Sequence, residues 1–156
     1  MELLEKLGQY LIWADEAIWN LVKNLTDEEF AQSSGGGMRS IRARYVHLAL
    51  DIYQWYNDWT GESPEDEPDF ENMPRDELFE SIAVYERKLV DLIKNRAFDA
   101  LELDADGNKI RVVFSEFLFH MVNHSTYHRG QIVASLRGLG KKVLMTDYVP
   151  FRIATA

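Results

Sequence analysis

The sequence predicts an all-α fold, an antiparallel four-helix bundle with a short β-hairpin before the last long helix. Four long segments carry apolar residues at intervals of three and four, which is the period of a helix with a buried face. Before the last segment, the pattern changes to alternating apolar and polar residues around Asp106 and Gly107, which is typical of a hairpin. We expect residues 1–156 to form a single domain, because a chain of this length can bury enough surface around one core.

The first long helix is expected over residues 2–24, where the apolar period is regular. The stretch TDEEF follows, in which Thr26 and Glu29 are placed as a capping box for a short helical turn. The run SSGGG at residues 33–37 then predicts a break in the chain. We expect the polypeptide to change direction here before the second long helix.

The second long helix is expected to run from Ser40, as N-cap, to Trp59, with Gly61 as its C-terminal stop. Its apolar residues lie on two nearly opposite faces, which indicates that the helix is buried on both. The acidic, proline-containing stretch GESPEDEPDFENMP has no period. It predicts a solvated crossover loop.

The third long helix is expected to begin at Pro74, because proline suits the first turn, and to reach about residue 95. After the hairpin, Ser115 is placed to cap the fourth long helix, which we expect to end near Arg137. Within this helix, Gly130 would let a neighbouring helix approach closely.

Composition excludes several classes of protein. A net charge of −9 and a pI near 4.9 argue against nucleic acid and anionic membranes as partners, because both require a basic face. No run of about 18 apolar residues predicts a membrane span, and the N-terminal stretch does not have the pattern of a signal peptide. The absence of cysteine excludes disulfides, thiolate ligands and a cysteine nucleophile, and fits a cytoplasmic location.

Three of the four histidines occur in the stretch HMVNHSTYHRGQI, at a strict spacing of four. On a helix, His120, His124 and His128 therefore share one face, and two adjacent members can bind one zinc ion. The outer two are separated by roughly 12 Å of helical rise, which is too far for both to bind the same ion. Either adjacent pair remains possible, and His124 belongs to both.

The fourth histidine, His47, lies on the second long helix, off the main apolar stripe and close in angle to Arg44 and Asp51. Because bundles build metal sites from facing helices, one ligand from this helix and two from the last form a plausible three-histidine set. A solvated polar face is the alternative interpretation. Near these histidines, His120, Gln131, Tyr127 and Asp51 are the candidate catalytic side chains, in that order.

Four stretches resemble the DinB family, within the DinB and YfiT-like superfamily of metalloenzymes. HMVNHSTYHRGQI is similar to the signature of the family's last helix. YLIWADEAIWNLV resembles its first helix, SIRARYVHLALDIYQWYNDWTG its histidine-bearing second helix, and LRGLGKKVLMTDYVPF its C-terminal tail. The resemblance covers nearly the whole chain.

The resemblance implies a four-helix bundle, often dimeric, that holds a divalent metal through one histidine of the second helix and an i, i+4 pair on the last. Carried over to this sequence, it gives His47, His124 and His128 as ligands and leaves His120 one turn away, beside the site. It favours a homodimer. Characterised members of the superfamily include bacillithiol transferases and a mycothiol-dependent isomerase, in which the metal is thought to activate a low-molecular-weight thiol.

We therefore expect a site that holds Zn²⁺ or Ni²⁺ and acts on a small-molecule substrate. Transfer of a low-molecular-weight thiol to an electrophile is the first expectation, and hydrolysis is the second. The competing hypothesis is a metal-binding or stress-response bundle without turnover, because no general base other than the histidines is evident.

Overall fold

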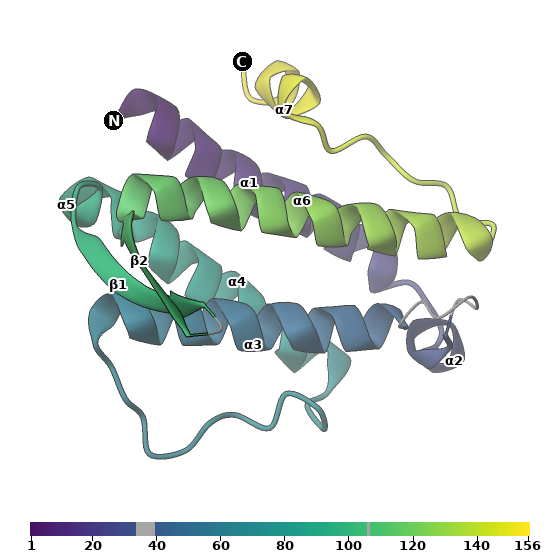
Figure 1. Cartoon of the computed structure of the whole chain (residues 1–156). Coiled ribbons are helices and arrows are strands. Elements are labelled where there is room, and N and C mark those ends of the chain that lie inside the picture. The colour runs from purple at the N-terminus through teal and green to yellow at the C-terminus, as the bar shows by residue number, and fades with distance from the viewer. Residues whose placement is uncertain (34–39, 106) are drawn as a thin grey trace.

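The computed structural model describes residues 1–33, 40–105 and 107–156, and in these ranges the chain is mostly helical with one small β-sheet (Figure 1). The helices are α1 (Glu2–Val22), α2 (Asp27–Ala31), α3 (Ile41–Thr60), α4 (Arg75–Asp91), α5 (Ile93–Arg96), α6 (Phe114–Gly138) and α7 (Tyr148–Ala154). The strands are β1 (Ala100–Ala105) and β2 (Asn108–Val113). Residues 34–37 of the predicted break, and Asp106 of the predicted hairpin turn, lie outside the described residues.

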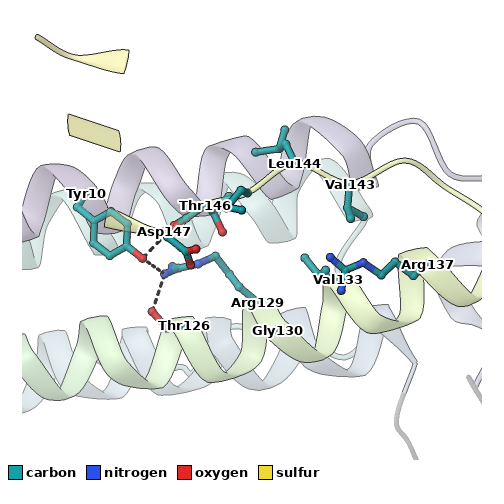
Figure 2. Close-up of a pocket in the computed structure, with 11 residues that line it drawn as sticks. Tyr10, Thr126, Arg129, Gly130, Val133, Arg137, Val143, Leu144, Thr146 and Asp147 are labelled. Carbon is teal, nitrogen blue, oxygen red and sulfur yellow. Dashed lines mark hydrogen bonds between the residues drawn. The ribbon is translucent and has the colours of Figure 1, made fainter. Parts of the chain in front are cut away.

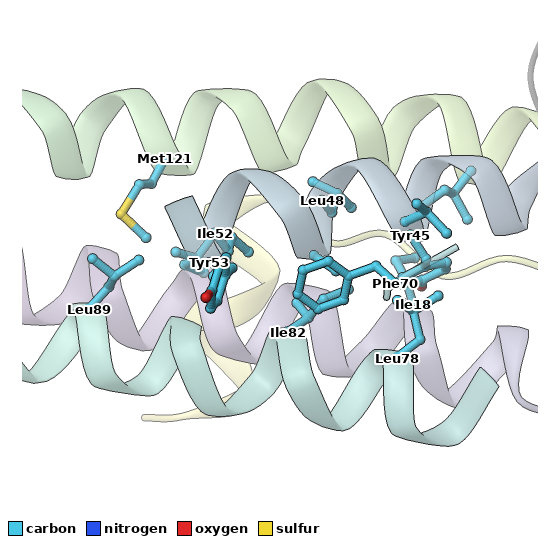
Figure 3. Packing of buried hydrophobic residues seen from close by; sticks show 14 of the residues in the cluster. Ile18, Tyr45, Leu48, Ile52, Tyr53, Phe70, Leu78, Ile82, Leu89 and Met121 are labelled. Carbon is cyan, nitrogen blue, oxygen red and sulfur yellow. The ribbon is translucent and has the colours of Figure 1, made fainter. Parts of the chain in front are cut away.

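Four long helices enclose the core in the described part of the chain. Helix α1 packs against α4 and α6, and α3 packs against the same two helices. Figure 3 shows how Ile18 of α1, Ile52 of α3 and Leu89 of α4 point into the space between these helices, where each is almost fully buried. Burial of this apolar surface is the main source of stability. None of the described helices is long and apolar enough to span a lipid bilayer.

The two ends of α3 are fixed as predicted. The Ser40 hydroxyl accepts a hydrogen bond from the backbone N–H of Ala43, at 3.0 Å. At the other end, Gly61 adopts the left-handed conformation (φ 73°), and its N–H donates to the carbonyl of Asn57. Because α3 carries His47, these two caps help to set where that side chain meets α6.

The capping box of α2 is also confirmed. The Thr26 hydroxyl accepts from the backbone N–H of Glu29, at 3.1 Å, and the Glu29 carboxylate accepts from the N–H of Thr26, at 3.0 Å. The third long helix differs slightly from its prediction. It starts at Arg75, with Pro74 as N-cap, and is interrupted at Leu92, so that the predicted last turn is the separate α5.

The predicted hairpin is present, and its register pairs Ala100 with Val113 and Ala105 with Asn108. The prediction that Ser115 caps the last long helix is wrong. Strand β2 stays paired up to Val113, so the chain passes directly from strand to helix. Val113 is the N-cap, and its N–H donates to the carboxylate of Glu116, at 3.0 Å. The side chain of Glu116, and not the hydroxyl of Ser115, therefore provides the hydrogen bond at this helix end.

A C-terminal helix that the sequence did not predict returns to the N-terminal half of the chain (Figure 1). Helix α7 buries Phe151 against Tyr10 and Ala14 of α1, with 5.7 Å between the ring centroids of Phe151 and Tyr10. The hydroxyl of Tyr10 also donates to the carbonyl of Thr146, at 3.0 Å. The C-terminal segment is thus tied to α1 by both apolar and polar contacts.

The close helix approach expected at Gly130 occurs instead at Gly8. A Cβ atom added to Gly8 would lie 2.7 Å from a methyl carbon of Val90 and 3.1 Å from Ile93 Cδ1. A Cβ atom added to Gly130 would meet nothing within 4 Å. Glycine is therefore sterically required where α1 meets α4 and α5, and not on α6.

Candidate metal centre

Three histidines from two facing helices come together on one side of the core. His47 lies on α3, and His124 and His128 lie one turn apart on α6. One ring nitrogen of each lies within 4.8 Å of the corresponding nitrogens of the other two. The ring centroid of His128 is 4.8 Å from that of His47 and 4.5 Å from that of His124. The described chain thus groups the three imidazoles that the sequence suggested as metal ligands.

His120 lies beside this group and is not part of it. Its ring centroid is 5.6 Å from that of His124, and its ring packs against Trp55 (5.3 Å) and Phe117 (6.0 Å). The residue is exposed, while His128 is buried. This arrangement follows from helical rise, because α6 carries His120 one turn beyond the point at which His47 faces it.

Asp51 lies between two of the histidines. It follows His47 by one helical turn, and its Oδ2 atom is 3.3 Å from Nε2 of His47 and 3.0 Å from Nε2 of His124. The side chain is 18% exposed. The proximity of Asp51 to His47 was expected from the spacing within one helix, but its contact with α6 depends on how α3 and α6 pack.

A hydrogen-bonded chain orients His128. Gln131 Oε1 lies 3.1 Å from Nδ1 of His128 and accepts a hydrogen bond from Nε of Arg44, at 3.2 Å. A carbonyl oxygen can only accept, so Nδ1 of His128 carries the proton and Nε2 keeps its lone pair. Metal-binding histidines are commonly held in this way through the nitrogen that does not bind the metal. Sequence reasoning placed Gln131 beside the last two histidines and Arg44 near His47, but it did not predict the contact between Gln131 and Arg44.

The surroundings favour neutral imidazoles. Burial lowers the pKa of His128 below its ordinary value, and positive charge on His124 or His47 would lower it further. Burial also lowers the pKa of His120, and so does charge on His124. Since the ordinary pKa of histidine is about 6.5, both rings are mainly neutral at pH 7, and a neutral imidazole has the lone pair that a metal requires.

His124 provides a further test of whether a metal fits here. Its Nε2 atom is shielded from solvent and makes no aligned hydrogen bond in the structure, although Asp51 lies 3.0 Å away. A buried polar atom without a hydrogen-bond partner is unfavourable unless something else satisfies it. Three imidazole nitrogens are a donor set that suits zinc and nickel. The residues therefore fit a divalent ion.

Aromatic side chains border the histidines. Trp55, from α3, places its ring centroid 5.2 Å from that of His124 and covers one side of the group. Tyr127 is 65% exposed, and its ring contacts that of His128, with 5.2 Å between centroids. Trp55 thus lies against His124, and the exposed Tyr127 lies against His128.

Another face of α6 carries a cluster of charged side chains. Arg129 directly follows His128, and its guanidinium donates to Oδ1 of Asp15, at 2.7 Å, and to the hydroxyl of Thr126, at 2.8 Å. A third hydrogen bond reaches the hydroxyl of Tyr10, at 3.3 Å. Figure 2 shows Tyr10, Thr126 and Arg129 in a pocket of about 410 Å³ between α6 and the C-terminal segment.

Glu86 of α4 adds a second carboxyl group to this cluster. It is 2% exposed, and Oε1 of its carboxyl group has no hydrogen-bond partner in the described residues. Burial raises the pKa of Glu86 well above its ordinary value, and the negative charge of Asp15 raises it further. The raised pKa favours the protonated, neutral form of the Glu86 carboxyl group.

The chain resembles known proteins over most of its length. The sequence model of the DinB family matches residues 1–155. Protein DinB of Bacillus subtilis (strain 168) is 30% identical over 158 residues, which cover 92% of this chain and 90% of that protein.

Among solved structures, YfiT from Bacillus subtilis is similar, with a TM-score of 0.72 and 18% identity over 91% of this chain and 90% of that one. YfiT is described as a probable metal-dependent hydrolase with an unusual four-helix bundle topology. A DinB-like protein from Bacillus cereus ATCC 10987 has a TM-score of 0.59 and 23% identity, over 89% of this chain and 94% of that one. By its sequence match over almost the whole length, the chain belongs to the DinB family.

Proposed function

We propose that the protein holds one divalent metal ion, zinc or nickel, through His47, His124 and His128, and that it is a metal-dependent hydrolase. The observation that carries the proposal is the grouping of three imidazole nitrogens within 4.8 Å of one another. The shielded Nε2 of His124, which has no hydrogen-bond partner, supports it. A bound divalent ion acts as a Lewis acid and lowers the pKa of a water molecule or thiol that it binds.

The surrounding side chains have separate tasks in this proposal. Gln131 and Arg44 hold His128 in the tautomer whose Nε2 is free to bind. His120 is placed one turn from His124, where it can accept a proton from the nucleophile, and it is exposed to solvent. Tyr127, at the solvent edge, can contact the substrate.

Hydrolysis is supported by the similarity in fold to YfiT, which is described as a probable metal-dependent hydrolase. Thiol transfer is the second candidate, and the resemblance of the last helix to its family signature supports it. Since the chain has no cysteine, the thiol would have to be a separate co-substrate. We also propose that the four long helices form an antiparallel bundle and that the protein is a homodimer, which light scattering in solution will test.

Metal analysis tests the binding site. We expect protein purified without an affinity tag to contain about one divalent ion per chain. The His124→Ala variant should lose the ion, while His120→Ala, which changes an equivalent residue one turn away, should retain it. A metal-free wild-type protein whose stability does not change in chelator would overturn the proposal.

An activity screen then separates the candidate reactions. Wild type and His47→Ala are incubated with activated esters and amides, with and without a low-molecular-weight thiol and an electrophile. Turnover by the metal-loaded wild type without thiol supports hydrolysis, whereas turnover only with thiol supports transferase activity. Metal binding without either activity would favour a bundle that binds metal and does not catalyse a reaction.

A further inference from the structure

We propose that Asp51 is a fourth protein ligand of the metal ion and binds it through Oδ2. This inference rests on the metal site proposed above. Oδ2 of Asp51 lies 3.0 Å from Nε2 of His124 and 3.3 Å from Nε2 of His47, so a single carboxylate oxygen touches two of the three candidate ligands.

These two distances match the spacing of atoms that share one ion. When ligand atoms lie about 2.0–2.2 Å from zinc, two neighbouring ligands in a tetrahedral or octahedral arrangement are about 2.8–3.6 Å apart. Both contacts of Asp51 fall inside this interval. The oxygen therefore lies where the coordination shell of an ion bound by His47 and His124 would place a ligand.

A hydrogen bond does not account for the closer contact. His124 Nε2 lies 3.0 Å from Asp51 Oδ2, but it has no hydrogen-bond partner, because the two groups are not aligned for one. A short distance without a hydrogen bond is the arrangement expected for two atoms whose lone pairs are directed at the same cation.

The two helices supply ligands in the same way. His47 and Asp51 are one turn apart on α3, as His124 and His128 are on α6, so each helix presents an i, i+4 pair to the other. Bundles build metal sites from side chains on facing helices, and an i, i+4 pair on one helix can bind a single zinc ion. Three neutral imidazoles leave both charges of a divalent ion uncompensated, and the half-buried Asp51 would compensate one of them.

The inference is tested by zinc affinity and by the structure of the zinc-loaded protein. Competition with a chromophoric chelator should show that Asp51→Asn binds zinc at least about tenfold more weakly than wild type. Asp58→Asn makes the same chemical change two turns away on α3, at an exposed position, and should bind zinc like wild type. Circular dichroism establishes that both variants are folded.

A crystal structure of the wild type loaded with zinc does not depend on the folding of any variant. It should place Asp51 Oδ2 about 2.0–2.2 Å from the ion. Undiminished affinity in folded Asp51→Asn, or an ion that lies more than about 3 Å from both oxygens of Asp51, overturns this inference and leaves the three-histidine site intact. A wild type that binds no zinc overturns the proposed function itself.

Discussion

The Oε1 atom of Gln131 lies 3.1 Å from Nδ1 of His128. The same oxygen accepts a hydrogen bond from Arg44 of α3, so one amide links the two helices that carry the histidines. Gln131 therefore acts on the site by fixing the ring of His128, and it does not need to contact the substrate.

Replacing Gln131 by alanine should weaken zinc binding by about 10- to 100-fold, because His128 loses the acceptor that fixes its tautomer and orientation. Competition with a chelator measures the effect. Gln54→Ala, at an exposed position on α3, is the control and should leave affinity unchanged. Equal affinity in Gln131→Ala and wild type would show that the hydrogen bond is not needed for binding.

Replacing Arg129 by methionine should lower the free energy of unfolding by about 3–5 kcal/mol, because Asp15, whose side chain is 13% exposed, loses its positive partner. Urea denaturation measures the loss. Arg87, which pairs with Glu16 at the surface, is the matched control, and Arg87→Met should cost only about 0–1 kcal/mol. Similar losses in the two variants would contradict a special role for the buried pair.

Replacing Glu86 by glutamine should make stability less dependent on pH. The folded-state pKa of Glu86 is raised, so the unfolded chain releases its proton at a lower pH than the folded chain does. The stability that this group contributes is complete below the unfolded pKa, about 4.3, and is lost as pH rises toward the folded value. The glutamine side chain is neutral at every pH, so the variant avoids this loss.

The free energy of unfolding of Glu86→Gln, relative to wild type, should therefore increase as the pH is raised from about 4 to 7. Urea titrations at several pH values provide the measurement. Glu80→Gln changes an exposed carboxyl on the same helix and should follow the wild-type profile. A constant difference between Glu86→Gln and wild type across this range would count against the raised pKa.

Adding one methyl group should have opposite effects at two glycines. Gly8→Ala should destabilise the protein by about 1–3 kcal/mol, because the new Cβ would lie 2.7 Å from Val90. Gly130→Ala meets no neighbouring atom within 4 Å and lies inside a helix, so it should stabilise by about 0.5–1 kcal/mol. Thermal unfolding of the two variants distinguishes these outcomes. A stabilised Gly8→Ala would show that α1 can move away from α4 without a loss of stability.

The sequence predicted local features well, because their causes are local. The caps at Thr26, Ser40 and Gly61 depend on residues within four positions, and each was found as predicted. The start of α6 was misplaced because the pairing of Val113 with Ala100 in the sheet decides where the helix begins, and this partner lies elsewhere in the sequence. Helix α7 was missed because its only buried residue, Phe151, gives no periodic signal.

In the candidate site too, features that depend on nearby residues were predicted and contacts between distant residues were not. Helical spacing placed His124 and His128 on one face, and the family resemblance selected this pair together with His47. Spacing alone could not reveal that Asp51 reaches His124 or that Arg44 reaches Gln131, because both contacts cross from α3 to α6. Such contacts depend on the rotation of each helix about its axis, which a single sequence does not specify.

His128 and Arg129 are consecutive residues whose side chains point about 100° apart around the axis of α6, one toward the histidine group and the other toward Asp15. If α6 turned about its axis enough to move His128 away from His47, the same turn would pull Arg129 away from Asp15 and leave two carboxyl groups in the core without it. The contacts of Arg129 thus oppose rotation of α6 about its axis. The positions of the histidines that could hold a metal are thus linked to an ion pair on another face of the same helix.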